Sequence, residues 1–137
     1  MYKGNVYQGK ALVIEDELII GRLFIEVLAS EGFDVDFAPN GMVAIEKVNE
    51  TDYQLCVSDI KMPGINGIDF YHYLEMEHPE MLARVILTTG DTRSPAIREF
   101  LKNGQKNFIP KPVLPSELVR KVKEVMHGNR GFPTAAA

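Results

Sequence analysis

Five short apolar segments alternate strictly with five stretches of helical periodicity along these 137 residues. The predicted strands are 11–14, 33–38, 53–58, 84–89 and 106–110. Most of them are apolar along their length, and the links to the helices are short. Such alternation predicts an α/β domain, in which a parallel sheet is covered by helices on both faces. Because crossovers between parallel strands are right-handed, only a few strand orders remain.

The predicted helices carry recognisable start and stop signals. Asn40 and Ser94 stand where an N-cap is expected, and Pro95 follows at a first helical position. Glycine commonly follows the end of a helix, as Gly32 and Gly104 would here. Helices are predicted from Glu17 to Gly32, after Asn40, from about Gly67 to His78, from Ser94 to Gly104, and from Pro115 to His127.

Composition narrows the class of protein. The formal net charge is -4 and no run of Lys or Arg stands out, which argues against a nucleic-acid-binding surface. No apolar run approaches the roughly 20 residues that cross a bilayer, and the N-terminus lacks the apolar core of a signal peptide. We therefore expect a cytoplasmic protein without membrane insertion. The single cysteine, Cys56, lies in an apolar run and is predicted to be a core residue.

Polar residues gather where the predicted strands end. In open α/β sheets, ligands bind beyond the carboxyl ends of the strands, so these residues are expected to share one edge. They are Glu15, Asp16 and Glu17 after the first strand, Asp59 after the third, Thr88 and Thr89 at the end of the fourth, and Lys111 after the fifth.

This set of groups suits phosphoryl chemistry. Crowded carboxylates raise one another's pKa, and Mg²⁺ relieves the repulsion with carboxylate, carbonyl, water and phosphate oxygens as ligands. A hydroxyl and an ammonium bind the other phosphoryl oxygens, and an aspartate can be the nucleophile. Each residue alone has an ordinary explanation, such as an acid at a helix start or a threonine in a strand. Their coincidence at one edge predicts a metal-assisted phosphoryl acceptor.

Four motifs resemble the receiver domain of two-component response regulators. They are LVIEDE (12–17), SDIKMPGINGIDF (58–70), ILTTGD (86–91) and IPKP (109–112). The resemblance implies a flavodoxin-like (βα)5 fold with strand order 2-1-3-4-5. It implies a signalling domain that promotes only its own phosphorylation and dephosphorylation, and that switches a surface read by a downstream output domain or protein.

The resemblance also implies how the phosphoryl group arrives. Asp59 matches the aspartate that accepts it from a histidine kinase or a histidine phosphotransfer domain. Asp16 matches the acid that binds Mg²⁺ directly, and Glu15 matches the acid that acts through a metal-bound water. The backbone carbonyl of Lys61 would be the third protein ligand, and Mn²⁺ is the alternative ion.

The remaining matches concern the phosphoryl oxygens and the switch. Thr89 matches the switch hydroxyl, and Gly90 is the small residue after it, which gives the phosphoryl group a backbone contact. Lys111 matches the lysine that contacts this group, and its bond to Pro112 is commonly cis in the family. Phe108 matches the switch aromatic residue.

The sequence departs from the family pattern at a few positions. Glu15 stands where many members have Asp, and its extra methylene is expected to leave Mg²⁺ binding intact. Lys61 and Asp91 occupy two variable positions, and their side chains are predicted to pair across the mouth of the site and slow the approach of water. The histidines are predicted to be surface residues and not phosphodonors. They are His72, His78 and His127.

Two other functional classes stay open. A pseudo-receiver would be an interaction module that never accepts phosphate, and a missing acceptor or lysine would favour it; both are present. The second class is a small enzyme on the same fold, such as a flavin binder or a phosphatase. A flavin binder would need a phosphate-cradling loop after the first strand, where this chain has three acids. A phosphatase with an aspartate nucleophile would need that nucleophile after the first strand and a second Asp two residues on. Here Asp59 follows the third strand, and the residue two positions on is Lys61.

The receiver domain is predicted to run from residue 10 to residue 127. Residues 1–9 are expected to form an N-terminal extension, and the Gly-, Pro- and Ala-containing residues 128–137 a flexible tail or a linker stub. No helix-turn-helix pattern follows residue 128. The chain is therefore expected to be either a stand-alone receiver or one cut from a longer protein such as a hybrid kinase.

Overall fold

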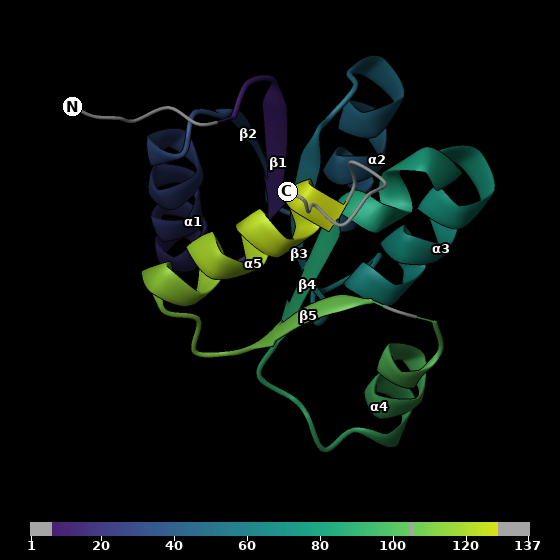
Figure 1. Ribbon diagram of the computed structural model, residues 1–137. Helices are drawn as coiled ribbons and strands as arrows, with labels where there is room; N and C mark the ends of the chain where they lie inside the picture. The colour runs from purple at the N-terminus through teal and green to yellow at the C-terminus, as the bar shows by residue number, and fades with distance from the viewer. Residues whose placement is uncertain (1–6, 105, 129–137) are drawn as a thin grey trace.

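A computed structural model describes residues 7–104 and 106–128 and confirms the predicted α/β architecture (Figure 1). The strands form one parallel sheet in the order β2-β1-β3-β4-β5, which is the flavodoxin-like order. They are β1 (Lys10–Ile14), β2 (Asp34–Ala38), β3 (Leu55–Asp59), β4 (Val85–Thr89) and β5 (Asn107–Pro110). Because all strands run in parallel, their carboxyl ends lie at one edge of the sheet.

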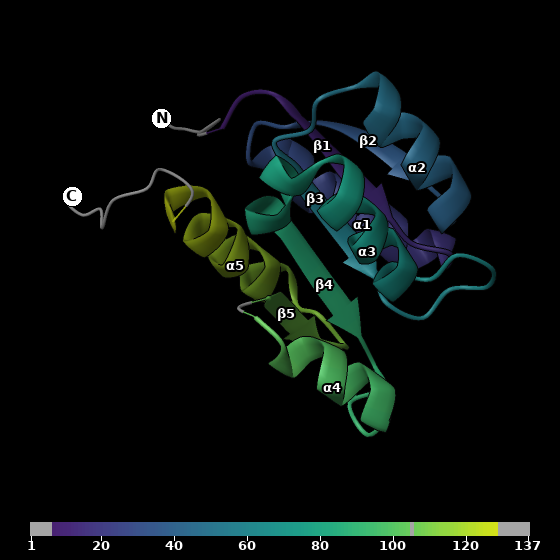
Figure 2. The same cartoon turned by 90° about the vertical axis from the view of Figure 1, so that its right-hand side faces the viewer.

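Helices cover both faces of this sheet, in three layers (Figure 2). α1 and α5 pack on one face, and α2, α3 and α4 on the other. The helices are α1 (Leu18–Ser30), α2 (Gly41–Glu50), α3 (Gly67–Glu77), α4 (Pro95–Lys102) and α5 (Pro115–Gly128). No helix in the described part of the chain is long and apolar enough to cross a membrane.

Each central strand contributes to two apolar layers. Ala11 and Val13 of β1 face α1 and α5, whereas Leu12 and Ile14 face α2, α3 and α4. Side chains alternate between the faces of a strand, so a strand covered on both sides is apolar throughout. This explains why the central strands read as continuous apolar runs in the sequence.

The predicted N-caps are confirmed. The side chain of Asn40 accepts a hydrogen bond from Val43 N, and that of Ser94 accepts one from Ile97 N. Asn66 caps α3 in the same way and forms a capping box with Asp69, a signal that the sequence analysis missed. The predicted cis bond between Lys111 and Pro112 is present.

The element boundaries differ from prediction on either side of β3 and β4. A 3₁₀ helix, η1 (Pro79–Arg84), precedes β4 and was not predicted. The strand predicted over 53–58 begins at Leu55 and includes Asp59. Tyr53 is buried all the same, because its hydroxyl donates to Asp36 Oδ2 and its carbonyl accepts from Arg84 Nη2. These side-chain contacts hold Tyr53 in place outside the strand.

The predicted ends of the domain are only partly described. Tyr7, within the predicted N-terminal extension, stacks on Phe33 and is 5% exposed. Gly128 is the last residue of α5. Residues 1–6 and 129–137 lie outside the described residues, so the extension and the tail stay predictions.

Candidate functional site

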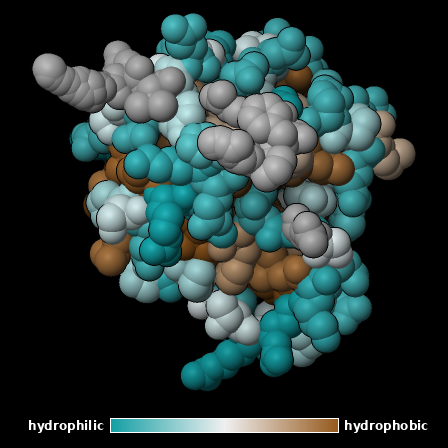
Figure 3. All heavy atoms as spheres, viewed as in Figure 1, coloured by the Kyte–Doolittle hydropathy of each residue, from teal (hydrophilic) through white to brown (hydrophobic). Residues whose placement is uncertain are grey.

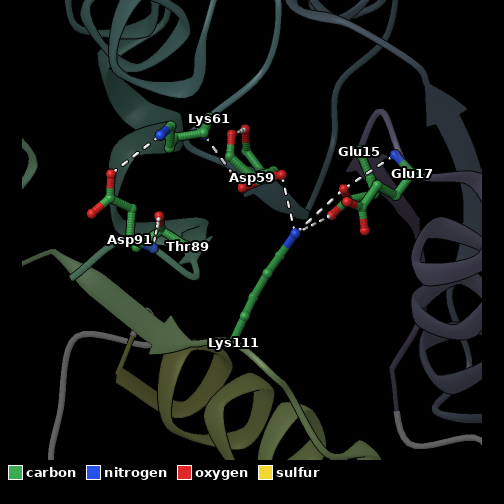
Figure 4. Close-up of polar contacts among 8 residues, drawn as sticks. Glu15, Glu17, Asp59, Lys61, Thr89, Asp91 and Lys111 are labelled. Atoms are coloured by element: carbon green, nitrogen blue, oxygen red, sulfur yellow. Dashed lines mark hydrogen bonds and ion pairs between the residues drawn. The ribbon is translucent and has the colours of Figure 1, made fainter. Parts of the chain in front are cut away.

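Two buried carboxylates mark the carboxyl edge of the sheet (Figure 4). Asp59 is the last residue of β3 and is 6% exposed, and Glu15, directly after β1, is fully buried. The two strands are hydrogen-bonded neighbours, with Ile14 opposite Ser58, so the next residue of each strand falls in the same row. The carboxyl edge of the sheet therefore carries two buried acids side by side.

Lys111 contacts both carboxylates. Its Nζ donates to Asp59 Oδ2 at 3.1 Å and lies 3.2 Å and 3.4 Å from Glu15 Oε1 and Oε2. The side chain of Lys111 is only 17% exposed, so water screens these contacts weakly. Burial lowers the pKa of Lys111, but the hydrogen bonds and charges of Asp59 and Glu15 outweigh burial and leave that pKa raised.

Glu15 is the most perturbed acid of the site. Burial, followed by the charge of Asp59, raises its pKa to about 7, although Lys111 acts in the opposite direction. Its Oε2 also accepts a hydrogen bond from the backbone N–H of Glu17 at 3.2 Å. The surroundings therefore disfavour the charged form of Glu15, and a further cation in the site would favour it again.

The predicted metal ligands lie together. Glu15, Asp16 and Asp59 each offer a carboxylate oxygen within 4.8 Å of the others, and Asp16 is exposed. Glu17 is not in this cluster and takes the N-cap position of α1 instead. Clustered carboxylate oxygens open to solvent on one side are the ligands that Mg²⁺ prefers. The donor set fits such an ion, and the individual ligand roles, including that of the Lys61 carbonyl, stay predictions.

The two threonines at the end of β4 differ in their surroundings. Both are fully buried, and Thr89 Oγ1 accepts a hydrogen bond from Asp91 N at 3.1 Å. Thr88 Oγ1 has no hydrogen-bond partner among residues 7–104 and 106–128. Gly90 adjoins the lysine, since a Cβ at this position would lie 3.8 Å from Lys111 Cβ.

Lys61 and Asp91 form the predicted ion pair. Lys61 Nζ lies 3.2 Å from Asp91 Oδ2, and the pair bridges the loops after β3 and β4 (Figure 4). The backbone N–H of Lys61 donates to Asp59 Oδ1 at 3.3 Å, and Asp91 Oδ1 accepts from Ser94 N at 3.1 Å. The side-chain hydrogen bond from Lys61 lowers the pKa of Asp91. That the ion pair slows the approach of water stays a prediction.

Gly67 is a residue of the site that the sequence analysis did not single out. A Cβ at Gly67 would lie 2.3 Å from the carbonyl oxygen of Asp59, so no larger residue fits there without moving the end of β3. Gly67 N also donates to Ile60 O at 2.8 Å. In the sequence, the second glycine of PGING indicates this close approach as well as the start of α3.

The other candidate residues lie at the periphery. Phe108, the predicted switch aromatic, is half-buried in β5. His127 is exposed and His72 contacts Glu75, as expected of surface residues. The side chain of His78 is only 23% exposed, because its Nε2 is hydrogen-bonded to Asn49. The expectation of a surface position therefore holds for two of the three histidines and only partly for His78.

Comparison with known proteins places this edge in context. The family model described as "Response regulator receiver domain" matches residues 11–123. The chain belongs to this family. Receivers are signalling domains of two-component systems.

Curated relatives are longer than this chain. The DNA-binding response regulator MtrA of Mycobacterium tuberculosis (strain ATCC 25618 / H37Rv) is 29% identical over 124 residues, which are 90% of this chain and 53% of MtrA. The transcriptional regulatory protein ResD of Bacillus subtilis (strain 168) is 32% identical over 117 residues, which are 85% of this chain and 48% of ResD. The receiver chain thus spans about half the length of these relatives.

Solved receivers share the fold over nearly their whole length. A CheY-like receiver domain protein from Methanospirillum hungatei JF-1 has a TM-score of 0.81 and 26% identity, over 91% of this chain and 98% of that one. The chemotaxis protein CheY4 of Vibrio cholerae has a TM-score of 0.77 and 24% identity, over 87% of this chain and 99% of its own. The second likeness concerns the fold alone.

Proposed function

We propose that this receiver accepts a phosphoryl group from a phosphohistidine onto Asp59, with the help of Mg²⁺, and thereby switches a protein-interaction surface. The observation that carries the proposal is the contact between Lys111 Nζ and Asp59 Oδ2, 3.1 Å long and flanked by the acids Glu15 and Asp16. An aspartate carboxylate can act as the nucleophile in such a transfer, and an ammonium in contact with it can afterwards bind the transferred group.

The ion would be held by Asp16, Asp59 and the Lys61 carbonyl, with Glu15 acting through a bound water. When bound, it supplies positive charge to the phosphoryl oxygens. The residues of the chain do the rest. An oxygen of Asp59 attacks phosphorus in line while the P–N bond breaks and the imidazole leaves. Lys111 then moves its ammonium to a phosphoryl oxygen, Thr89 donates its hydroxyl to another, and the backbone at Gly90 contacts the group.

The partner would be a histidine kinase or a histidine phosphotransfer domain. Apolar side chains at the start of α1 and in the loop before α5 support a protein donor, because they are exposed beside the site. Ile19 is 87% exposed, Leu18 68% and Leu114 58%. Figure 3 shows apolar surface over α1, on the left of the view. A small-molecule donor would have no use for such side chains.

The output would follow from a shift between two states. Thr89 moves toward the phosphoryl group and vacates space that half-buried Phe108 fills, and the surface of α4, β5 and α5 changes with it. Phosphorylation helps only as far as it favours one state over the other. An output domain or protein would read this surface. We propose no direct contact of this domain with nucleic acid, and a cytoplasmic location stays a prediction.

The test is phosphorylation by acetyl phosphate with Mg²⁺, followed by an intact mass. A single phosphoryl adduct is expected, and it should disappear in an Asp59→Asn variant and in a sample with EDTA. An Asp34→Asn variant at the opposite edge is the matched control and should keep the adduct. Absence of both an adduct and Mg²⁺ binding would overturn the proposal and leave a receiver-shaped interaction module.

A further inference from the structure

One buried hydroxyl at the site has no partner. Thr88 is fully buried, yet its Oγ1 makes no hydrogen bond to any residue that the structure describes. Buried hydroxyls in native proteins almost always have a partner, because an unpaired one loses its hydrogen bonds to water without compensation. The unpaired oxygen therefore calls for a role beyond packing.

The sheet register places Thr88 next to the acceptor. Thr88 of β4 is paired with Asp59 of β3 on one side and with Ile109 of β5 on the other. Ile86, two residues earlier on β4, and Val57, two residues before Asp59, both face α1 and α5. Because side chains alternate along a strand, Thr88 and Asp59 lie on that same face.

Lys111 reaches Asp59 across the end of β4. It follows β5, yet its ammonium contacts Asp59 on β3 and Glu15 beyond β1. Neighbouring strands lie about 4.8 Å apart, and β4 stands between β5 and β3. On the face that the lysine crosses, the residue of β4 in register with Asp59 is Thr88.

We infer that the Thr88 hydroxyl is a hydrogen-bond acceptor for the Lys111 ammonium in the phosphorylated state, which makes Thr88 a positioning residue for the lysine. This rests on the proposed function. In the unmodified protein the ammonium donates to Glu15 and Asp59 and leaves Thr88 unpaired. Once an Asp59 oxygen carries the phosphoryl group as an acyl phosphate, the ammonium turns to a phosphoryl oxygen and one of its three N–H donors meets Thr88 Oγ1.

The unpaired Thr88 hydroxyl lowers the stability of the unmodified protein, and its hydrogen bond with Lys111 would stabilise the phosphorylated form. Valine replaces the hydroxyl of threonine by a methyl group of similar size, and it suits a buried strand at least as well. If Thr88 only filled space, Thr88→Val would leave the binding of a phosphoryl mimic unchanged. If it holds Lys111, the same variant weakens that binding without weakening the fold.

The experiment measures the affinity of the full chain for beryllofluoride with Mg²⁺, by calorimetry, together with unfolding by urea. Thr88→Val is expected to bind beryllofluoride about tenfold more weakly, the equivalent of one hydrogen bond to a charged group. It should be as stable as the parent chain, or more so, without the ligand. Thr88→Ser keeps the hydroxyl and should restore tight binding.

Ile86→Val, on the same face of β4, is the matched control. It should lower stability by trimming the core and leave beryllofluoride affinity unchanged. Thr88→Val binding as tightly as the parent chain would overturn the inference and leave the proposed function intact. If the parent chain itself bound no beryllofluoride with Mg²⁺, the proposed function would fail and the inference with it.

Discussion

At the amino-terminal ends of β1 and β2 this receiver pairs its charges in contact with solvent, whereas at the carboxyl ends of β1 and β3 it buries them. Lys10 Nζ lies 3.0 Å from Asp34 and 3.4 Å from Asp36, and the side chain of Asp34 is 76% exposed. Lys111 makes a similar two-acid contact with Glu15 and Asp59, which are 0% and 6% exposed. The same pattern of one lysine and two acids therefore sits in two dielectric environments.

The pKa shifts record the difference. A hydrogen bond from Tyr53 is the main cause that lowers the pKa of Asp36, so the folded chain favours its charged form. Burial and Asp59 raise the pKa of Glu15 to about 7, so the folded chain opposes its charge. The solvent-facing end behaves as a stabilising ion pair, and the buried end stores unfavourable charge that an incoming cation relieves. Buried, mutually repelling acids are a mark of a functional site.

The largest expected effect comes from removing each lysine in turn. Lys111→Met should reduce the rate of phosphorylation by acetyl phosphate by about 100-fold or more, because the developing phosphoryl charge loses its ammonium. Lys10→Met should leave that rate unchanged. Stopped assays with intact mass measure both. Equal rates for the two variants would show that the buried lysine has no special role.

The pH dependence of stability should separate the two ends next. For Glu15 the folded pKa lies above the unfolded value of 4.5, so the folded chain binds its proton more tightly. Its contribution to stability is therefore fully present below about pH 4.5 and is lost as pH rises through about 7. The loss should amount to about 2–3 kcal/mol. For Asp36 the pKa is lowered, so its contribution is present above the unfolded pKa and is lost as pH falls.

Urea unfolding between pH 4.5 and pH 8 checks this sign. Relative to the parent chain, Glu15→Gln should gain stability as pH rises through this window, and Asp36→Asn should not. A Glu15→Gln variant with the same pH profile as the parent chain would contradict the raised pKa of Glu15. The comparison uses differences between variants, which cancel the titration of all other groups.

Divalent cations should act at one end only. At ten times its dissociation constant, Mg²⁺ should stabilise the chain by about 1.4 kcal/mol, a rise in Tm of a few degrees. Asp16→Asn should abolish this rise because it removes an exposed member of the carboxylate cluster. Asp34→Asn, at the solvent-facing charge cluster, should keep it. Thermal unfolding at constant ionic strength distinguishes the site from general screening.

The contrast also shows what sequence can supply. The parallel sheet followed from alternation, its strand order from the family resemblance, and the two N-caps from local chemistry at Asn40 and Ser94. The cluster of Glu15, Asp16 and Asp59 followed because strand ends share an edge. These features depend on periodicity and connectivity, which the sequence states directly.

Other features depended on side-chain positions that no local pattern encodes. Glu15 was expected only near a metal-bound water, yet both its oxygens lie within 3.4 Å of the ammonium of Lys111, 96 positions away. The 3₁₀ helix before β4 buries Met81, but its six residues are too few for a helical period to stand out in the sequence. That the Thr88 hydroxyl has no partner among the described residues can be recognised only once its neighbours in the fold are known.

The smallest effect is expected at the boundary between buried and exposed charge. Lys61 and Asp91 pair at the mouth of the site, where the side chain of Lys61 is 64% exposed. Replacing either residue by alanine should therefore not change stability measurably. Their pairing bridges the loops after β3 and β4, and Lys61 N contacts Asp59, so we predict that breaking the pair admits water to the site. Lys61→Ala and Asp91→Ala should each shorten the lifetime of the phosphorylated form by a few-fold. The double variant should add nothing further, because either change alone already removes the contact. Loss of the phosphoryl adduct, followed by mass after removal of the donor, measures this. Fully additive effects would mean that the two residues act separately, and that the pair does not close the site.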